Sequence, residues 1–260
     1  MQAMSPKNDN VTGREPALKA LLWDMDGTLI DSEPYWHQVE MDIVHEYGGS
    51  WNEEIGWQCS GIAVPIVAQT MVDHGVKLPP ERIVRLLIEG VARKEFEHMP
   101  WIEGVEDVLR SLAAAHIPSV LVTASPRRMA ENLVSQAPDG VFVGYVCSDD
   151  DLPKKPDPAP YLAAAKVVGV VRPANADAEQ ERAFRREMAR CVAIEDSMTG
   201  LESAVASGAT TIAQTGFIGT DTSHGPQFAS ISGYEGLDAA RLNEYAAQRL
   251  AAFDDEAAAK

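Results

Sequence analysis

The sequence predicts an α/β fold: a doubly wound parallel sheet with an inserted all-helical cap domain. Short apolar runs alternate with helical patterns along most of the chain, which is typical of parallel sheets that carry helices on both faces. The first run, at 18–23, ends abruptly at Asp24, as a buried strand does where it opens into a loop. Residues 33–100 show helical patterns alone, and this interruption predicts the insertion.

The remaining strands and helices follow from the same two patterns. Apolar runs predict further strands at 119–122, 141–147, 191–194, 210–213 and 228–231. Helical spacing predicts core helices at 105–115, 127–136, 158–168 and 200–207, and insertion helices at 35–47, 64–74 and 80–97. The stretch 174–190 is rich in helix formers and charges, so we expect an exposed extra helix there. The alternation of the core elements is Rossmann-like.

These elements divide the chain into four parts. We expect a disordered leader at 1–17, a core domain made of 18–32 and 101–250, a cap domain at 33–100 and a tail at 251–260. The leader is polar and lacks the apolar segment of a signal peptide. The cysteine count is odd and contains no C-x-x-C pair, which favours a reducing compartment. We therefore expect a cytoplasmic protein, with a monomer as the default state.

The charge balance excludes two classes of partner. The chain has 22 Lys and Arg against 39 Asp and Glu, a formal net charge of −17. Such a surface repels nucleic acid and anionic membranes, so we expect neither as a partner. No apolar run is long enough to span a bilayer. An anionic ligand would need a local positive field at its site.

Polar clusters follow the first four predicted core strands. They are "DMDGTLIDSE" from Asp24, "TASPRR" from Thr123, "SDDDLPKKPDP" with Lys154 and Lys155, and "EDSMTG" from Glu195. Ligands of parallel sheets bind beyond the carboxyl ends of the strands, where these clusters would meet. Carboxylates held close together repel each other unless one is protonated or a cation lies between them. Oxygen ligands without His or Cys suit Mg²⁺ rather than zinc.

The four clusters resemble the signatures of one known family. "DMDGTLIDSE" looks like the first signature of the haloacid dehalogenase-like hydrolase superfamily, "LVTAS" resembles its second, "KKPDP" its third and "AIEDSMTGLESAVASGA" its fourth. They occur in the family's order, and the resemblance covers about 18–213. The subgroup with a helical cap after the first signature is the most similar. It includes β-phosphoglucomutase and many small-molecule phosphatases.

The resemblance implies a magnesium-dependent phosphomonoester hydrolase. Its substrate would be a small phosphate ester, which reacts through an aspartyl-phosphate intermediate, with Asp24 as nucleophile and Asp26 as acid and base. Phosphate oxygens would be held by the hydroxyl of Thr123, the amide of Ala124 and the ammonium of Lys155. The implied Mg²⁺ ligands are Asp24, the Asp26 backbone carbonyl and Asp196, with Glu195 as an outer, water-mediated ligand. Lys155 rather than Lys154 directly precedes proline, as the family's lysine does.

Two alternatives remain beside the hydrolase. The family's dehalogenases lack the second aspartate, so Asp26 argues for phosphoryl transfer. A β-phosphoglucomutase-like mutase would carry a cap-hinge histidine, but that position here is Trp36, with His37 beside it. A catalytically silent phosphate-binding protein is the other alternative, although every signature position is filled.

By the same resemblance, the cap selects the substrate. Relatives place specificity residues in the loop that corresponds to "QCSGIAVP" at 58–65, where Gly61 is followed by Ile62. An apolar loop there suits a leaving group without a second anion. Glu33 and Trp36 are further candidates for lining the pocket. Sugar, polyol and nucleoside phosphates all stay open as substrates.

Overall fold

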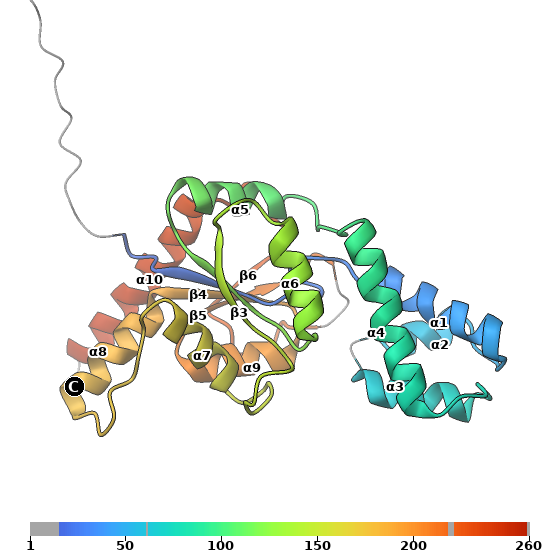
Figure 1. The fold of residues 1–260 in the computed structure, drawn as a ribbon. Coiled ribbons are helices and arrows are strands. Elements are labelled where there is room, and N and C mark those ends of the chain that lie inside the picture. Colours follow the sequence, from blue (N-terminus) through green and yellow to red (C-terminus); the bar gives the residue numbers. More distant parts are fainter. Residues whose placement is uncertain (1–15, 61, 218–220, 259–260) are drawn as a thin grey trace, which may run out of the picture.

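The core of the molecule is a parallel sheet of six strands. The computed structural model describes residues 16–60, 62–217 and 221–258, and Figure 1 shows the core with a helical group beside it. The strands lie in the order β3-β2-β1-β4-β5-β6, and each neighbouring pair is parallel. Their bounds are β1 Ala20–Trp23, β2 Ser119–Val122, β3 Phe142–Val146, β4 Cys191–Glu195, β5 Thr210–Gln214 and β6 Ala229–Ile231. The predicted fold class is confirmed.

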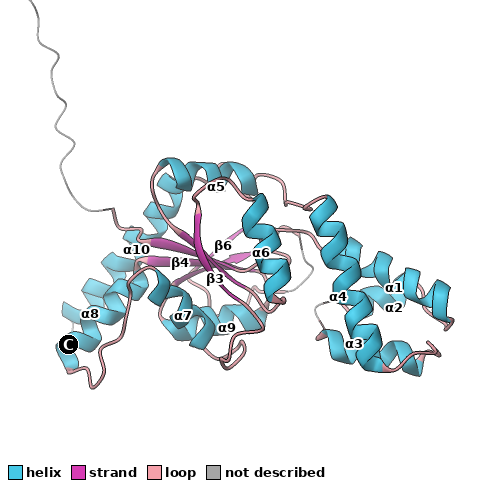
Figure 2. Cartoon of the chain, in the orientation of Figure 1, coloured by secondary structure: helices cyan, strands magenta, loops and turns pink. Residues whose placement is uncertain are grey.

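Helices cover both faces of the sheet (Figure 2). Side chains alternate along a strand, so Leu21 and Trp23 of β1 belong to one hydrophobic cluster and Ala20 and Leu22 to another. The first cluster includes residues of α5 Val105–Ala114, α6 Arg127–Gln136 and α10 Ala239–Ala258. The second includes residues of α7 Ala159–Val167, α8 Ala178–Ala189 and α9 Met198–Ser207. Because β1 is buried on both faces, its sequence is continuously apolar.

A group of helices lies between β1 and β2 in sequence. These helices are α1 Glu33–Tyr47, α2 Glu53–Gln58, α3 Val64–Asp73 and α4 Pro80–Glu97. Helix α4 packs closely on α1 at Gly90, where an added Cβ would overlap the side chain of Val39. The described part of this segment contains no strand, as expected of a helical cap.

The structure differs from the sequence expectations at two helices. Helix α2 was not predicted, and it is preceded by the N-cap Asn52, whose side chain accepts a hydrogen bond from the Ile55 amide. Helix α10 was not predicted either, and residues 251–258, which were expected to be a tail, form its end, where Arg186 of α8 pairs with Asp254. The extra helix expected within 174–190 is present as α8 and begins with a capping box at Asp177.

Two further expectations concern the chain ends and membranes. Most of the predicted leader, 1–15, lies outside the described residues. The backbone carbonyls of Pro16 and Ala17 accept hydrogen bonds from the Arg190 guanidinium. These bonds hold the chain in place just before β1. Within the described chain, every helix is too short or too polar to cross a membrane.

Candidate active site

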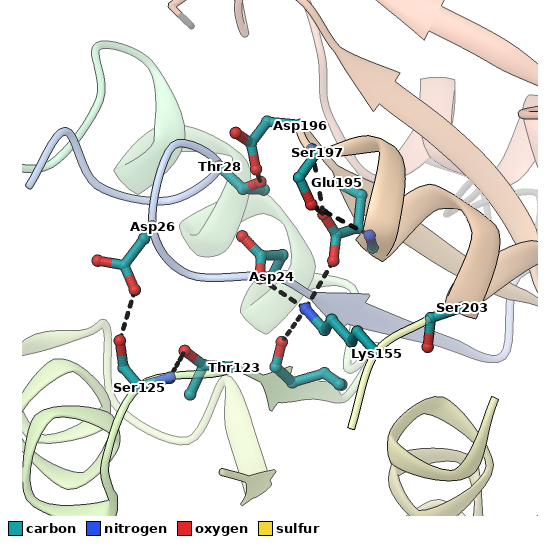
Figure 3. Close-up of polar contacts among 12 residues, drawn as sticks. Asp24, Asp26, Thr28, Thr123, Ser125, Lys155, Glu195, Asp196, Ser197 and Ser203 are labelled. Atoms are coloured by element: carbon teal, nitrogen blue, oxygen red, sulfur yellow. Dashed lines mark hydrogen bonds and ion pairs between the residues drawn. The ribbon is translucent and has the colours of Figure 1, made fainter. Parts of the chain in front are cut away.

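Asp24, Thr123 and Asp196 directly follow the adjacent strands β1, β2 and β4, and Lys155 reaches the same edge from the loop after β3 (Figure 3). The Asp24 amide donates to the Ile194 carbonyl at 3.1 Å, so the ladder between β1 and β4 continues until the aspartate. The Thr123 amide likewise donates to the Val146 carbonyl at 2.9 Å, and Asp196 directly follows β4. The parallel register therefore carries all three side chains to the same edge of the sheet.

Lys155 connects the acidic groups of this edge. Its Nζ donates to Asp24 Oδ1 at 2.7 Å, to Glu195 Oε1 at 2.6 Å and to the Val122 carbonyl at 2.9 Å. The neighbouring Lys154 donates instead to backbone carbonyls of its own loop, those of Ser148 and Asp150. Lys155, and not Lys154, thus joins the carboxylate cluster.

The carboxylate of Glu195 is fully buried and held by several donors. Its Oε1 accepts from Tyr161 Oη at 2.8 Å in addition to Lys155, and its Oε2 accepts from Ser197 Oγ at 3.2 Å. A Cβ at Gly200 of α9 would overlap this carboxylate, so glycine leaves the space that Glu195 needs. Tyr161 and Ser197 were not identified from the sequence as partners of Glu195.

Asp26 lies apart from this cluster. Its carboxylate accepts from Ser32 Oγ at 2.6 Å and from Ser125 Oγ at 2.7 Å, and it points toward Ser125 (Figure 3). Gly27 has a φ of 79°, a conformation that lets the chain turn sharply after Asp26. The next residue, Thr28, donates to Asp196 Oδ1 at 3.2 Å, so this turn also contacts the end of β4.

The carboxylates outnumber the single ammonium of the cluster. Oxygens of Asp24, Glu195 and Asp196 lie within 4.8 Å of one another. Burial, followed by the charge of Glu195, raises the pKa of Asp24 to about 7. Burial, followed by the charge of Asp24, raises the pKa of Asp196 to about 9.

The same charges act on Lys155 in the opposite sense. Burial disfavours its ammonium, but Asp24 and Glu195 together raise the pKa of Lys155 above its usual value. Lys155 therefore stays charged, yet it does not neutralise three carboxylates. The raised pKa values of Asp24 and Asp196 indicate a site that gains from a further cation. An all-oxygen donor set fits a hard dication such as Mg²⁺.

Thr123 and Ala124 border a small pocket beside Lys155. Thr123 Oγ1 accepts a hydrogen bond from the Ser125 amide at 2.9 Å, which shapes the turn after β2. The same turn brings Ser125 to Asp26, so one short segment contacts both the pocket and the second aspartate.

The cap candidates have three different surroundings. Glu33 Oε2 accepts from Ser60 Oγ at 2.8 Å. Trp36 is half-buried and packs against the hydrophobic core, whereas Ile62 is exposed. Gly61 lies outside the described residues. His37, the neighbour of Trp36, is buried in the cap beside Glu33 and Ser60.

Comparisons with known proteins point to one family. A sequence-family model described as haloacid dehalogenase-like hydrolase matches residues 18–208. The chain is 26% identical over 200 residues to a 6-phosphogluconate phosphatase from Escherichia coli, covering 74% of this chain and 80% of that protein. It is 27% identical over 188 residues to hexitol phosphatase B from the same organism, covering 70% and 77%. A solved β-phosphoglucomutase from Clostridium difficile has a TM-score of 0.66 at 15% identity, covering 90% of this chain and 99% of that one, and shares the fold.

Proposed function

The chain belongs to the haloacid dehalogenase-like hydrolase family, and from that premise we propose that it is a phosphomonoester hydrolase acting on a small phosphorylated metabolite. The observation that carries the proposal is the convergence of Asp24, Lys155 and Asp196 at one sheet edge, with Asp26 two residues beyond Asp24. Relatives named as phosphatases support the same reaction class.

In the first half of the proposed reaction, Asp24 is the nucleophile. One of its carboxylate oxygens attacks phosphorus, the bond from phosphorus to the leaving oxygen breaks, and an aspartyl-phosphate forms. Asp26 gives its proton to the leaving oxygen, which departs as an alcohol. The hydroxyls of Ser32 and Ser125 donate to the Asp26 carboxylate and orient it at this edge of the sheet.

In the second half, Asp26 acts as a base. Its carboxylate takes a proton from a water molecule whose oxygen attacks phosphorus, and the bond from phosphorus to Asp24 breaks. Inorganic phosphate and the free Asp24 carboxylate result, and Asp26 is protonated again for the next cycle.

We assign phosphate binding to Thr123, Ala124 and Lys155. The hydroxyl of Thr123, the amide of Ala124 and the ammonium of Lys155 are donors that would offset the charge on the phosphate oxygens. The proposed cofactor is Mg²⁺, with Asp24, the Asp26 carbonyl and Asp196 as ligands and Glu195 as an outer, water-mediated ligand. When bound, Mg²⁺ supplies positive charge that the acidic cluster lacks.

We further propose a cytoplasmic monomer whose partner is a small phosphate ester. The cysteines at 59, 147 and 191 are free and buried, as in proteins of reducing compartments. A net charge of −17 disfavours nucleic acid and anionic membranes as partners.

Replacement of the proposed nucleophile tests the function. Asp24→Asn should lower Mg²⁺-dependent release of phosphate from p-nitrophenyl phosphate by at least about a thousandfold, because the amide is not a nucleophile. Asp42→Asn, on the exposed side of α1, is the control and should leave the rate unchanged. Unchanged turnover in Asp24→Asn would disprove the mechanism. Conversion of β-glucose 1-phosphate to glucose 6-phosphate faster than hydrolysis would favour a mutase instead.

A further inference from the structure

Three polar side chains of the cap converge between the start of α1 and the loop after α2. Ser60 Oγ donates to Glu33 Oε2 at 2.8 Å. His37 Nε2 lies 3.4 Å from Ser60 Oγ and 3.6 Å from Glu33 Oε2. The side chains of Glu33 and His37 retain 20% and 11% exposure, so water or a ligand still reaches the cluster. We call these three residues the cap triad.

The cap triad adjoins the proposed acid and base along the chain, through Ser32. Glu33 follows Ser32, whose hydroxyl donates to Asp26 Oδ1 at 2.6 Å. Asp26 is the group that would protonate the leaving oxygen, so the leaving group must lie within reach of its carboxyl. The residue after Ser32 is therefore well placed to contact the part of the substrate that extends from phosphate into the cap.

The surroundings of the cap triad are acidic and apolar. In the described part of the chain, no Lys or Arg forms an ion pair with Glu33, whose carboxylate lies 3.6 Å from His37 Nε2. The Trp57 ring meets the His37 ring edge to face with centroids 4.4 Å apart, and 58% of Trp57 is exposed. Ile62, two residues beyond Ser60, is also exposed.

This combination matches the chemistry of polyhydroxylated compounds. Hydroxyl groups donate to a carboxylate and exchange hydrogen bonds with a serine hydroxyl or an imidazole. The C–H faces of the same carbon chain pack on an aromatic ring such as that of Trp57. A second anion in the leaving group would instead face the Glu33 carboxylate, which has no Lys or Arg partner among the described residues.

We infer that the cap triad of Glu33, Ser60 and His37 determines specificity, and that it selects an uncharged polyol or sugar as the leaving group over one with a second anion. The inference rests on the proposed phosphatase function and narrows it to one substrate class.

Two matched substrates test the inference. Glucitol 6-phosphate and 6-phosphogluconate have the same carbon chain but end in a hydroxymethyl group and a carboxylate, respectively. We expect the wild type to prefer glucitol 6-phosphate by about tenfold or more in kcat/KM, since a hydrogen bond to a charged acceptor and the avoided repulsion both favour it. Glu33→Gln removes the charge and keeps the shape, and it should reduce this preference by about tenfold.

Because each variant is judged by the ratio of kcat/KM for the two substrates, a loss of activity that affects both substrates equally cancels. Ser60→Ala is the second variant, and it should lower kcat/KM for glucitol 6-phosphate more than for 6-phosphogluconate. Glu54→Gln, an exposed carboxylate of α2, is the matched control and should leave the ratio unchanged. A wild type without preference, or an unchanged ratio in both triad variants, would overturn the inference while p-nitrophenyl phosphate hydrolysis still supports the phosphatase. Loss of that hydrolysis from the wild type would instead refute the proposed function.

Discussion

Glu195 is positioned to hold Lys155. Its Oε1 accepts from both Lys155 and Tyr161, and its Oε2 accepts from Ser197, so the protein itself supplies donors to both oxygens. Lys155 Nζ also lies 5.3 Å from the centroid of the Tyr161 ring. A carboxylate engaged in this way supports an outer place for Glu195 at the proposed metal. Tyr161 then acts on phosphate binding only through Glu195 and Lys155, as a positioning residue.

Tyr161→Phe tests this arrangement. The variant leaves the buried Glu195 Oε1 with one donor fewer, which we expect to lower the free energy of unfolding by about 1–2 kcal/mol. Because Glu195 loses a donor that orients it toward Lys155, KM for p-nitrophenyl phosphate should rise severalfold. Kinetics and denaturant unfolding measure both effects. Tyr145→Phe is the control, because the hydroxyl that it removes donates to the exposed Glu131 instead. A Tyr161→Phe enzyme that loses stability but keeps its KM would show a purely structural hydroxyl.

The contacts of single residues differ in how well the sequence predicts them. Asp24, Thr123 and Asp196 could be placed together because each follows a buried strand, and the sheet brings strand ends to one edge. Ser125 belongs to the same predicted cluster as Thr123, but no pattern links it to Asp26. Its hydroxyl reaches Asp26, 99 residues away in sequence, only through the turn that follows β2. Such partners depend on side-chain directions in the folded chain, which spacing along the sequence does not encode.

At the scale of elements, the core strands and the helices between them were predicted, whereas helices α2 and α10 were not. Strand β1 and helix α4 carry strong patterns and were expected. Helix α2 is six residues long, too short for an apolar period, and it depends on the cap at Asn52 and on the close approach of Gly56 to His37 and Glu40. Helix α10 is 20 residues long, and the ion pair of Asp254 with Arg186 joins its end to distant α8, a contact that the sequence does not reveal.

Helix α4 carries an unusual buried acid where it meets α6. Glu95 is 0% exposed, and neither carboxylate oxygen has a hydrogen-bond partner among the described residues. Its backbone carbonyl accepts from Gln136 Nε2 of α6 at 3.0 Å. Burial, followed by the charge of Asp26, raises the pKa of Glu95 to about 9. The acid is therefore neutral at pH 7 in the folded protein but ionised when the chain unfolds.

This difference predicts how stability changes with pH. The folded state holds a proton that the unfolded state releases above about pH 4.5, so the Glu95 contribution to stability falls as pH rises from about 4.5 to about 9. The slope approaches about 1.4 kcal/mol per pH unit within that window. Glu95→Gln stays neutral and should remove this slope. The free energy of unfolding of the variant, relative to that of the wild type, should therefore increase from pH 5.5 to pH 8.5.

Denaturant unfolding of both proteins at the two pH values measures the effect. Glu97→Gln, an exposed position on the same helix, is the control, and its difference from the wild type should stay constant with pH. A constant difference for Glu95→Gln as well would mean that Glu95 is ionised in the folded protein.

At the scale of the whole molecule, the site must attract an anion within a chain of net charge −17. Lys155 is the one ammonium bound to the central carboxylates among the described contacts, and Asp24 and Glu195 already engage it. A bound dication would reverse the local potential while the surface stays acidic. Activity should therefore be lost in EDTA, and Ca²⁺ should substitute poorly because it prefers more ligands in a looser geometry.

Protons and the metal should compete for the same carboxylates, so the affinity for Mg²⁺ should depend on pH. With pKa values of about 7 for Asp24 and about 9 for Asp196, the metal-free cluster holds protons that Mg²⁺ must displace. Affinity for Mg²⁺ should rise between pH 6 and pH 9, by up to about tenfold per pH unit for each proton displaced. Calorimetric titration without substrate measures this directly, since a phosphate ester would add its own titration. Asp196→Asn should weaken binding and flatten the pH dependence, whereas an affinity that is independent of pH would mean that the metal binds elsewhere.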